Sequence, residues 1–317
     1  KVDSEQIEIL YGNGSATSNS KFNLVFPRRY IATSTNYSGL LDFDYVEIPT
    51  GVTLTLNADS ALRIEASYIV IDGTINGEGK GYTAPTSCVD GSGPGGASRG
   101  ACNNGGGGAY GGQGGCPPRS GAPSCGGSRS STYGSASGFD INKGSSGSLG
   151  GGGSTDRAGD GGGAVILNGD VVAINGTINV NGEDGLARST GSFGGGGGAG
   201  GGILITSRRI EHNTSVLTAD GGLAGNSYGA SGGGGRIKLF YKETTTGTTN
   251  LSVDGFNDHA QSGTPTTLRQ SAAVGAAGTT VNSNTTLTET PAVIIRNEEL
   301  RNSIATNAIT GTNFCSG

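Results

Sequence analysis

The chain has 317 residues, of which 64 are glycine, about three times the usual share. Met and Trp are absent, and aromatic residues make up 6 % of the chain, so a large core of bulky side chains is excluded. The net charge of −5 and the scattered basic residues argue against nucleic acid as a partner. No window approaches the ~18 continuous apolar residues that a membrane span needs.

Residues 1–45 do not carry the repeat that dominates the rest of the chain. Alternating apolar residues predict short strands at Ile7–Tyr11 and at Phe22–Phe26. We therefore predict an N-terminal extension over 1–45, which could supply an inter-subunit strand.

A glycine-rich β-repeat domain is predicted over residues 46–255. It opens with Val46–Leu56, where two short alternating strands flank a Pro-Thr-Gly turn. This run resembles the opening coil of many extracellular β-solenoids.

Copies of an apolar strand, a turn and a second strand follow. The turn residue lies ten residues after the first apolar residue in three copies, which run from Leu62 to Asp72, from Val165 to Asn175 and from Ile203 to Asn213. A fourth, weaker copy begins at Ile237. An alignment without gaps places Ile64, Leu167 and Ile205 in one column.

These copies predict an all-β fold of stacked, β-solenoid-like repeats. Each copy is too short to bury its apolar face alone, and stacking on the next copy would bury it. Asx-Gly turns supply the backbone conformation that a tight turn needs. The alternative is a β-sandwich of antiparallel hairpins, in which Asn-Gly is also a common turn.

Glycine runs come immediately before the apolar strands, as in GGGAVIL (161–167) and GGGILI (200–205). Polyglycine can form a left-handed helix with three residues per turn and no internal hydrogen bonds, so neighbouring segments must pair with it. We expect ordered polyglycine-II-like segments packed beside the β stack.

The runs CNNGGGGAYGGQGG (102–115) and GGGGGAGGGILI (194–205) resemble the glycine-rich extracellular domain of the anaplastic lymphoma kinase-type receptors. The resemblance covers roughly Gly105–Leu239. It implies polyglycine-II helices combined with β structure. Receptor function does not carry over, because the chain contains no kinase or membrane segment.

The same glycine runs do not predict a nucleotide site. A phosphate-binding loop follows a strand and opens a helix, whereas these runs precede strands. We expect no cofactor.

Five cysteines are present: Cys88, Cys102, Cys116, Cys125 and Cys315. The first four lie in a predicted insertion at about residues 80–150. Their spacings do not match the short knuckles of zinc sites, so we expect disulfides in an oxidising compartment, of unknown pairing. Free thiols or a metal cluster are the alternatives. The insertion is thus predicted to be a disulfide-pinned loop against one face of the stack.

Ser, Thr, Ala and Asn dominate residues 256–317. A stack has two open ends with strand edges that can pair with another chain. This segment is predicted either to cap one end or to exchange a strand with a neighbouring subunit.

Six asparagines lie in glycosylation sequons, a number close to the one expected by chance. Asn175 and Asn213 share a turn column, from which a glycan would project outward. The six candidates are Asn13, Asn36, Asn175, Asn213, Asn250 and Asn284.

Few residues suggest catalysis. A structural role is the default for His212, and His259 follows Asp258 in a polar turn. Acidic side chains on turns could bind structural calcium, although they match no known calcium loop. These acids are Asp156, Asp160, Glu183, Asp184, Asp254 and Asp258.

Three functions are consistent with the sequence. The first is an extracellular or cell-surface structural protein, a non-enzymatic subunit of a filament or surface coat that partners with itself. The second is an adhesin or carbohydrate-binding surface protein. The third, by fold analogy alone, is a polysaccharide-active β-helix enzyme that uses Asp72, Asp254 and Arg209.

Overall fold

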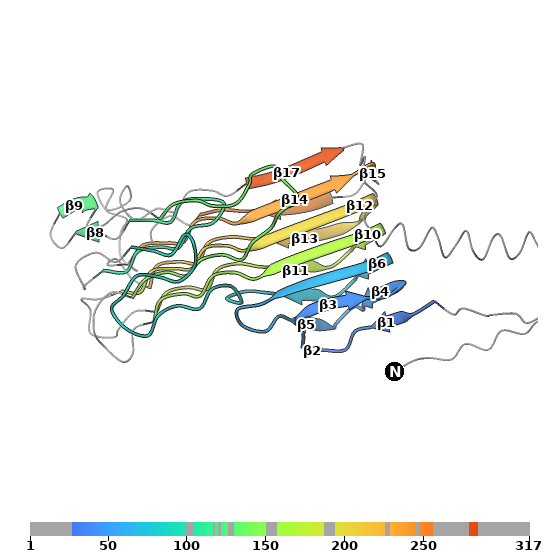
Figure 1. Cartoon of the computed structure of the whole chain (residues 1–317), viewed down its shortest axis with the longest axis horizontal. Coiled ribbons are helices and arrows are strands. Elements are labelled where there is room, and N and C mark those ends of the chain that lie inside the picture. Colours follow the sequence, from blue (N-terminus) through green and yellow to red (C-terminus); the bar gives the residue numbers. More distant parts are fainter. Residues whose placement is uncertain are drawn as a thin grey trace, which may run out of the picture.

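The computed structural model describes residues 27–98, 104–116, 118–119, 122–125, 130–149, 157–186, 194–225, 229–244, 248–255 and 279–284. Within these ranges the protein is all-β, with no helix and with two sheets of parallel strands. The strands stack along one direction, and glycine-rich segments extend from one side of the stack (Figure 1). The strands predicted at Ile7–Tyr11 and Phe22–Phe26 lie outside the described residues.

The two parallel sheets hold all but two of the strands that the structure describes. Sheet A contains β1 (Arg29–Ile31), β3 (Gly39–Asp42), β4 (Tyr45–Ile48), β6 (Ala61–Ile71), β10 (Ala164–Ile174), β12 (Gly202–His212), β14 (Arg236–Tyr241), β15 (Glu243–Thr244) and β17 (Thr279–Asn284). Sheet B contains β2 (Thr35–Asn36), β5 (Thr53–Thr55), β7 (Thr74–Asn76), β11 (Thr177–Asn179), β13 (Thr214–Thr218) and β16 (Thr248–Ser252). A separate antiparallel pair is formed by β8 (Pro118–Arg119) and β9 (Ala122–Cys125).

The predicted columns of the repeat are confirmed. Leu167 pairs with Ile64 on one side and with Ile205 on the other, in parallel register. The strands on either side of an Asx-Gly turn, such as β10 and β11, lie in different sheets and pair with their counterparts in other copies. These copies are therefore not antiparallel hairpins.

Sheet A has a corner that divides it into two strips. In β6 the buried apolar residues alternate up to Ala66, and the alternation resumes one residue out of phase at Ile69. β3 and β14 pair with the part of the long strands before this corner, and β4 and β15 pair with the part after it. We call these parts the first and second strips. One passage through the first strip, the second strip and sheet B is one rung.

Aliphatic side chains fill the space between the strips and sheet B. Each rung contributes Ile, Leu or Val residues that are fully buried, such as Ile64 and Ile69 from β6 and Ile75 from β7. Burial of such side chains stabilises a fold by about 1.5–3 kcal/mol each. The core is built from a ladder of similar residues and needs no large aromatic side chain.

The third copy departs from the strict repeat after its turn. His212 still pairs with Ile174, but Val216 pairs with Thr177, so the turn at Asn213 holds one residue more than the turn at Asn175. In the fourth copy Ile237 pairs with Ile203, as the alignment predicts. Gly247, expected at its turn, lies outside the described residues.

The run 194–201 forms the centre of the glycine-rich region. Its backbone N–H groups donate to three neighbouring segments in turn, so that every third residue donates to the same segment. Gly196 and Ala199 donate to 145–148, Gly197 and Gly200 donate to 230–233, and Gly198 and Gly201 donate to 180–183, over N···O distances of 2.7–3.1 Å. A hydrogen-bonding direction that repeats every third residue requires a backbone with three residues per turn.

Three further segments surround the same run and donate to its carbonyl groups. Gly105 and Gly108 donate to Gly194 and Gly197, Gly159 and Gly162 donate to Gly196 and Ala199, and Gly222 and Gly225 donate to Gly198 and Gly195. The run therefore has six neighbours. A Cβ added to Gly198 would lie 1.9 Å from the carbonyl oxygen of Asp160, so the packing leaves no room there for a side chain.

Parts of both predicted flanking segments belong to the stack. β1, β2 and β3 lie within 1–45 and pair with β4, β5 and β6. β17 lies within 256–317 and pairs with β14. The described part of the 80–150 insertion joins the glycine-rich region, where the Gly144 N–H donates to Gly162 and the Gly147 N–H donates to Gly159.

Candidate functional site

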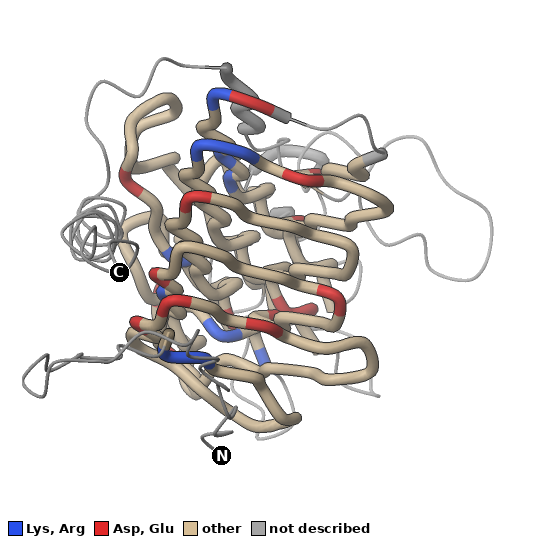
Figure 2. Tube along the Cα trace, turned by 90° about the vertical axis from the view of Figure 1, so that its right-hand side faces the viewer, with Lys and Arg blue, Asp and Glu red and all other residues tan. Residues whose placement is uncertain are grey.

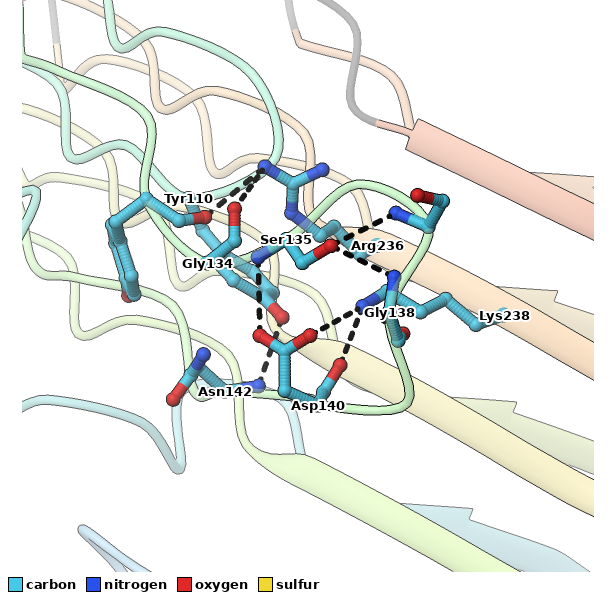
Figure 3. A network of polar contacts seen from close by, with 10 residues as sticks. Tyr110, Gly134, Ser135, Gly138, Asp140, Asn142, Arg236 and Lys238 are labelled. Atoms are coloured by element: carbon cyan, nitrogen blue, oxygen red, sulfur yellow. Dashed lines mark hydrogen bonds and ion pairs between the residues drawn. The ribbon is translucent and has the colours of Figure 1, made fainter. Parts of the chain in front are cut away.

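The main polar network of the described chain lies on the outer face of β14. The segment 130–149 crosses this face and covers it (Figure 3). β14 presents Arg236, Lys238 and Phe240 outward, because Ile237 and Leu239 belong to the core ladder. Phe139 packs on Phe240 with ring centroids 4.3 Å apart.

Lys238 is the most unusual residue of this network, because its side chain is fully buried. Its ammonium group donates to the carbonyl oxygens of Gly138 and Asp140, at 2.8 and 2.5 Å, and lies 3.3 Å from the Asp140 carboxylate. Burial lowers the pKa of Lys238, although the Asp140 charge opposes this change. A buried ammonium group needs such partners to avoid a large desolvation cost.

Asp140 holds the covering segment together. Its Oδ2 atom accepts a hydrogen bond from the Ser135 backbone N–H at 3.1 Å. Burial by itself would raise the pKa of Asp140, but this hydrogen bond and the charge of Lys238 together lower it. The carboxylate therefore stays ionised and joins two parts of the segment to β14.

Arg236 anchors the other end of the network. Its guanidinium donates to the carbonyl oxygen of Tyr133 at 3.0 Å and lies 5.3 Å from the centroid of the Tyr110 ring. The Tyr110 hydroxyl accepts a hydrogen bond from the Asn142 N–H at 2.8 Å. Burial raises the pKa of Tyr110 to about 12. These contacts join β14 to the covering segment, so the network fastens the segment to the sheet.

Ladders of polar side chains run along the turns. The Asn175 amide donates to the Asp72 carboxylate at 2.7 Å, and the Asn179 amide donates to Glu78 at 3.0 Å. The Asp220 carboxylate accepts from the Ser252 hydroxyl at 2.6 Å and from the Asp254 backbone N–H at 2.7 Å. Many turn acids thus bind the next rung.

A polar depression of about 320 Å³ lies where the rungs that contain β5 and β7 meet the glycine-rich region. Carboxylate and basic side chains share its wall, and the Asp160 carboxylate within it accepts a hydrogen bond from the Ala84 N–H at 2.6 Å. Its lining consists of Thr55, Asn76, Glu78, Gly79, Lys80, Arg157, Asp160 and Glu183.

The structure describes three of the five cysteines. Cys88 is half-buried, Cys116 is buried and Cys125 ends β9. No disulfide joins Cys88 to Cys116. Cys102 and Cys315 lie outside the described residues, so any pairing that includes them stays a prediction.

Four candidate glycosylation sites are exposed: Asn36, Asn175, Asn213 and Asn250. Asn175 and Asn213 follow the paired residues Ile174 and His212, as the predicted turn column requires. Asn284 ends β17, and Asn13 lies outside the described residues.

The three residues considered for catalysis lie on different rungs and at different places along a rung. Asp72 lies at the turn between the sheets, Arg209 lies on the second strip and Asp254 follows β16. Arg209 pairs with Glu211 at 2.9 Å. His212 lies 3.3 Å from the Ser215 hydroxyl, and burial lowers its pKa.

Among the residues that the structure describes, no three His, Cys, Asp or Glu side chains are grouped to hold a metal ion. Asp156, Asp258 and His259 lie outside those residues. The described chain also has no helix with the length and apolar character of a membrane span. Acidic and basic residues are interspersed over the stacked rungs (Figure 2).

Comparisons with protein-family models, with curated proteins and with solved structures find no match to this chain. The resemblance to the glycine-rich receptor domain stays a prediction.

Sequence reasoning missed the network on β14. RIKLFY (236–241) by itself predicts only a weak repeat copy, although it places two cations among apolar residues. Two cations on the outward positions of an otherwise apolar strand indicate that another segment with acceptor groups covers that face. The position of this segment at 130–149 could not be inferred from β14 itself.

Proposed function

We propose that this chain is an extracellular structural protein, a subunit that assembles with copies of itself into a filament or surface coat. The observation that carries the proposal is that the parallel stack has an open strand edge at each end of its described part. β1, β2 and β3 form one end, and β15, β16 and β17 form the other. Open edges of this kind template pairing with another chain.

The architecture also supports a structural role. We infer that the strands form a β-solenoid and that the glycine runs form polyglycine-II helices, because the hydrogen-bonding direction of 194–201 repeats every third residue. Both parts repeat along the same axis. Such a body can be extended by stacking without a change in its internal packing.

An extracellular or cell-surface location completes the proposal. It rests on the cysteines of the insertion, which we expect to form disulfides of unknown pairing, and on the exposed sequons. Disulfides form and persist in oxidising compartments.

Sedimentation and electron microscopy over a range of protein concentrations test self-assembly. Ordered polymers are expected as concentration rises. Leu40, on β3 at one open end, and Leu186, beside the glycine-rich region, are both 50 % exposed and offer a matched pair. Leu40→Lys should suppress polymers, because a charge on an edge strand blocks pairing. Leu186→Lys should leave them unchanged. Protein that stays monomeric at high concentration would contradict the proposal.

A second candidate function is glycan binding at the polar depression, where Glu78, Lys80 and Arg157 offer both hydrogen-bond acceptors and donors. A glycan array tests it. Binding that is lost in Lys80→Ala and retained in Lys242→Ala, an exposed lysine on another part of the stack, would favour this function. An array without binding would reject it.

A further inference from the structure

In the part of the chain that the structure describes, the two open ends of the stack are incomplete in complementary ways. The described chain begins in the middle of a rung, with β1 on the second strip and β2 in sheet B. It ends at the start of a rung, with β17 on the first strip. One end thus presents the last two strands of a rung, and the other end presents the first strand.

From this stagger we infer that a second copy stacks head to tail and completes the broken rung. β1 of the second copy would pair with β15, β2 with β16 and β3 with β17, all in parallel. The combined rung would consist of β17 from one copy followed by β1 and β2 from the next, which is the same strand order as in every internal rung. This inference rests on the proposed self-assembly and specifies its geometry.

The internal columns fix the register of this junction. The column that contains Arg29 runs through Tyr45, Tyr68, Val171 and Arg209 to Glu243. The column that contains Asn36 runs through Thr55, Asn76, Asn179 and Thr218 to Ser252. A continued stack therefore places Arg29 of one copy beside Glu243 of the other, and Asn36 beside Ser252.

The side chains at the two ends are consistent with this junction. Arg29 and Glu243 have opposite charges. Arg28 would lie near Lys242, but it is already within 3.3 Å of Asp42 and 3.9 Å of Asp44 in its own chain. Ile31 and Leu40, on β1 and β3, are 51 % and 50 % exposed, and a copy stacked on this end would cover part of each. Burial of exposed apolar area favours association.

Cysteine cross-linking tests the register directly. Residues paired on adjacent strands lie about 4.8 Å apart, within the Cα separation that a disulfide spans. Within one chain Asn36 and Ser252 are separated by five strand spacings, about 24 Å, so a disulfide between them must join two molecules. Mild oxidation of the Asn36→Cys/Ser252→Cys variant should give a covalent ladder on a non-reducing gel, at least tenfold above the native protein.

Thr35→Cys/Ser252→Cys is the matched control. A shift of one residue moves the side chain to the opposite face of the strand, so this variant should give no ladder above the native protein. Equal ladders from both variants would overturn the inference, because they would show non-specific collision. Polymers in the micrographs without a ladder from Asn36→Cys/Ser252→Cys would also overturn it, and would leave the proposed self-assembly in place. A protein that never polymerises would contradict both.

A charge exchange provides an independent measurement. Arg29→Glu should raise the concentration needed for assembly by on the order of fivefold, because it places two carboxylates together at the junction. The double variant Arg29→Glu/Glu243→Arg should return that concentration toward the native value. Failure of the second exchange to restore assembly would contradict the Arg29–Glu243 contact.

Discussion

The strand stack and the glycine-rich region continue from one another along each passage of the chain, but they are stabilised in opposite ways. In the stack, Ile and Leu side chains fill the space between the sheets, and Ile205 is fully buried among them. In the glycine-rich region, backbone groups of neighbouring segments hydrogen-bond to each other, and at Gly198 no side chain fits between them. One repeat can therefore combine a core made of side chains with a core made mainly of backbone.

This difference predicts that adding one carbon atom to the glycine-rich region destabilises the protein more than removing one from the strand stack. Gly198→Ala should show the largest effect. The new Cβ would lie 1.9 Å from the Asp160 carbonyl oxygen, a backbone atom that cannot rotate away. We expect a loss of about 3 kcal/mol or more in the free energy of unfolding, at the upper end of overpacking effects. Urea denaturation followed by circular dichroism measures it.

Ala199→Gly is the control in the adjacent position. Ala199 is buried in the same run. Its replacement removes a methyl group and adds freedom to the unfolded chain, so a loss of about 0.5–1 kcal/mol is expected. Equal losses in the two variants would show that the absence of side chains does not stabilise this region.

The polar network on β14 should give an intermediate effect. Asp140→Asn removes the carboxylate that faces the buried Lys238 ammonium and leaves that cation with carbonyl partners only. Because the Asp140 side chain is 45 % exposed, water offsets part of the loss, and we expect about 1–2 kcal/mol. Hydrogen exchange of residues 130–149 should rise in this variant, while exchange in β10 should not.

The pH dependence of the same contact provides its control. The pKa of Asp140 is lowered in the folded protein. The carboxylate's contribution to stability is therefore complete above the pKa that Asp140 has in the unfolded chain, and it is lost as the pH falls through the pKa that Asp140 has in the folded protein. The stability difference between the native protein and Asp140→Asn should therefore shrink below about pH 4. A difference that is constant from pH 7 to pH 3 would contradict the role of the carboxylate.

Ile205→Val should show a small effect, comparable with that of Ala199→Gly. It removes one methylene group from the ladder that Leu167, Ile205 and Leu239 form across three rungs. Such a change costs about 0.5–1.5 kcal/mol in a packed core. Thermal unfolding measures it. A loss as large as that of Gly198→Ala would remove the contrast between the two regions.

Much of the strand stack could be predicted from sequence. The ten-residue offset from Val165 to Asn175 and from Ile203 to Asn213 gave the columns that the register confirms. The extra residue in the turn after His212 was not foreseen, because a turn can absorb one residue without moving the apolar positions before it. The position of 130–149 over β14 was missed, since nothing in RIKLFY encodes where its covering segment lies in the chain.

The sequence by itself determined the central strands β6, β10 and β12 and which of their residues share a column, because apolar side chains carry that information in their spacing. Only the tertiary structure decided how the glycine runs are arranged. The runs 105–108, 159–163, 194–201 and 230–235 lie side by side although long stretches of chain separate them. Glycine has no side chain to mark a face or a partner, so only the folded backbone shows which segments meet.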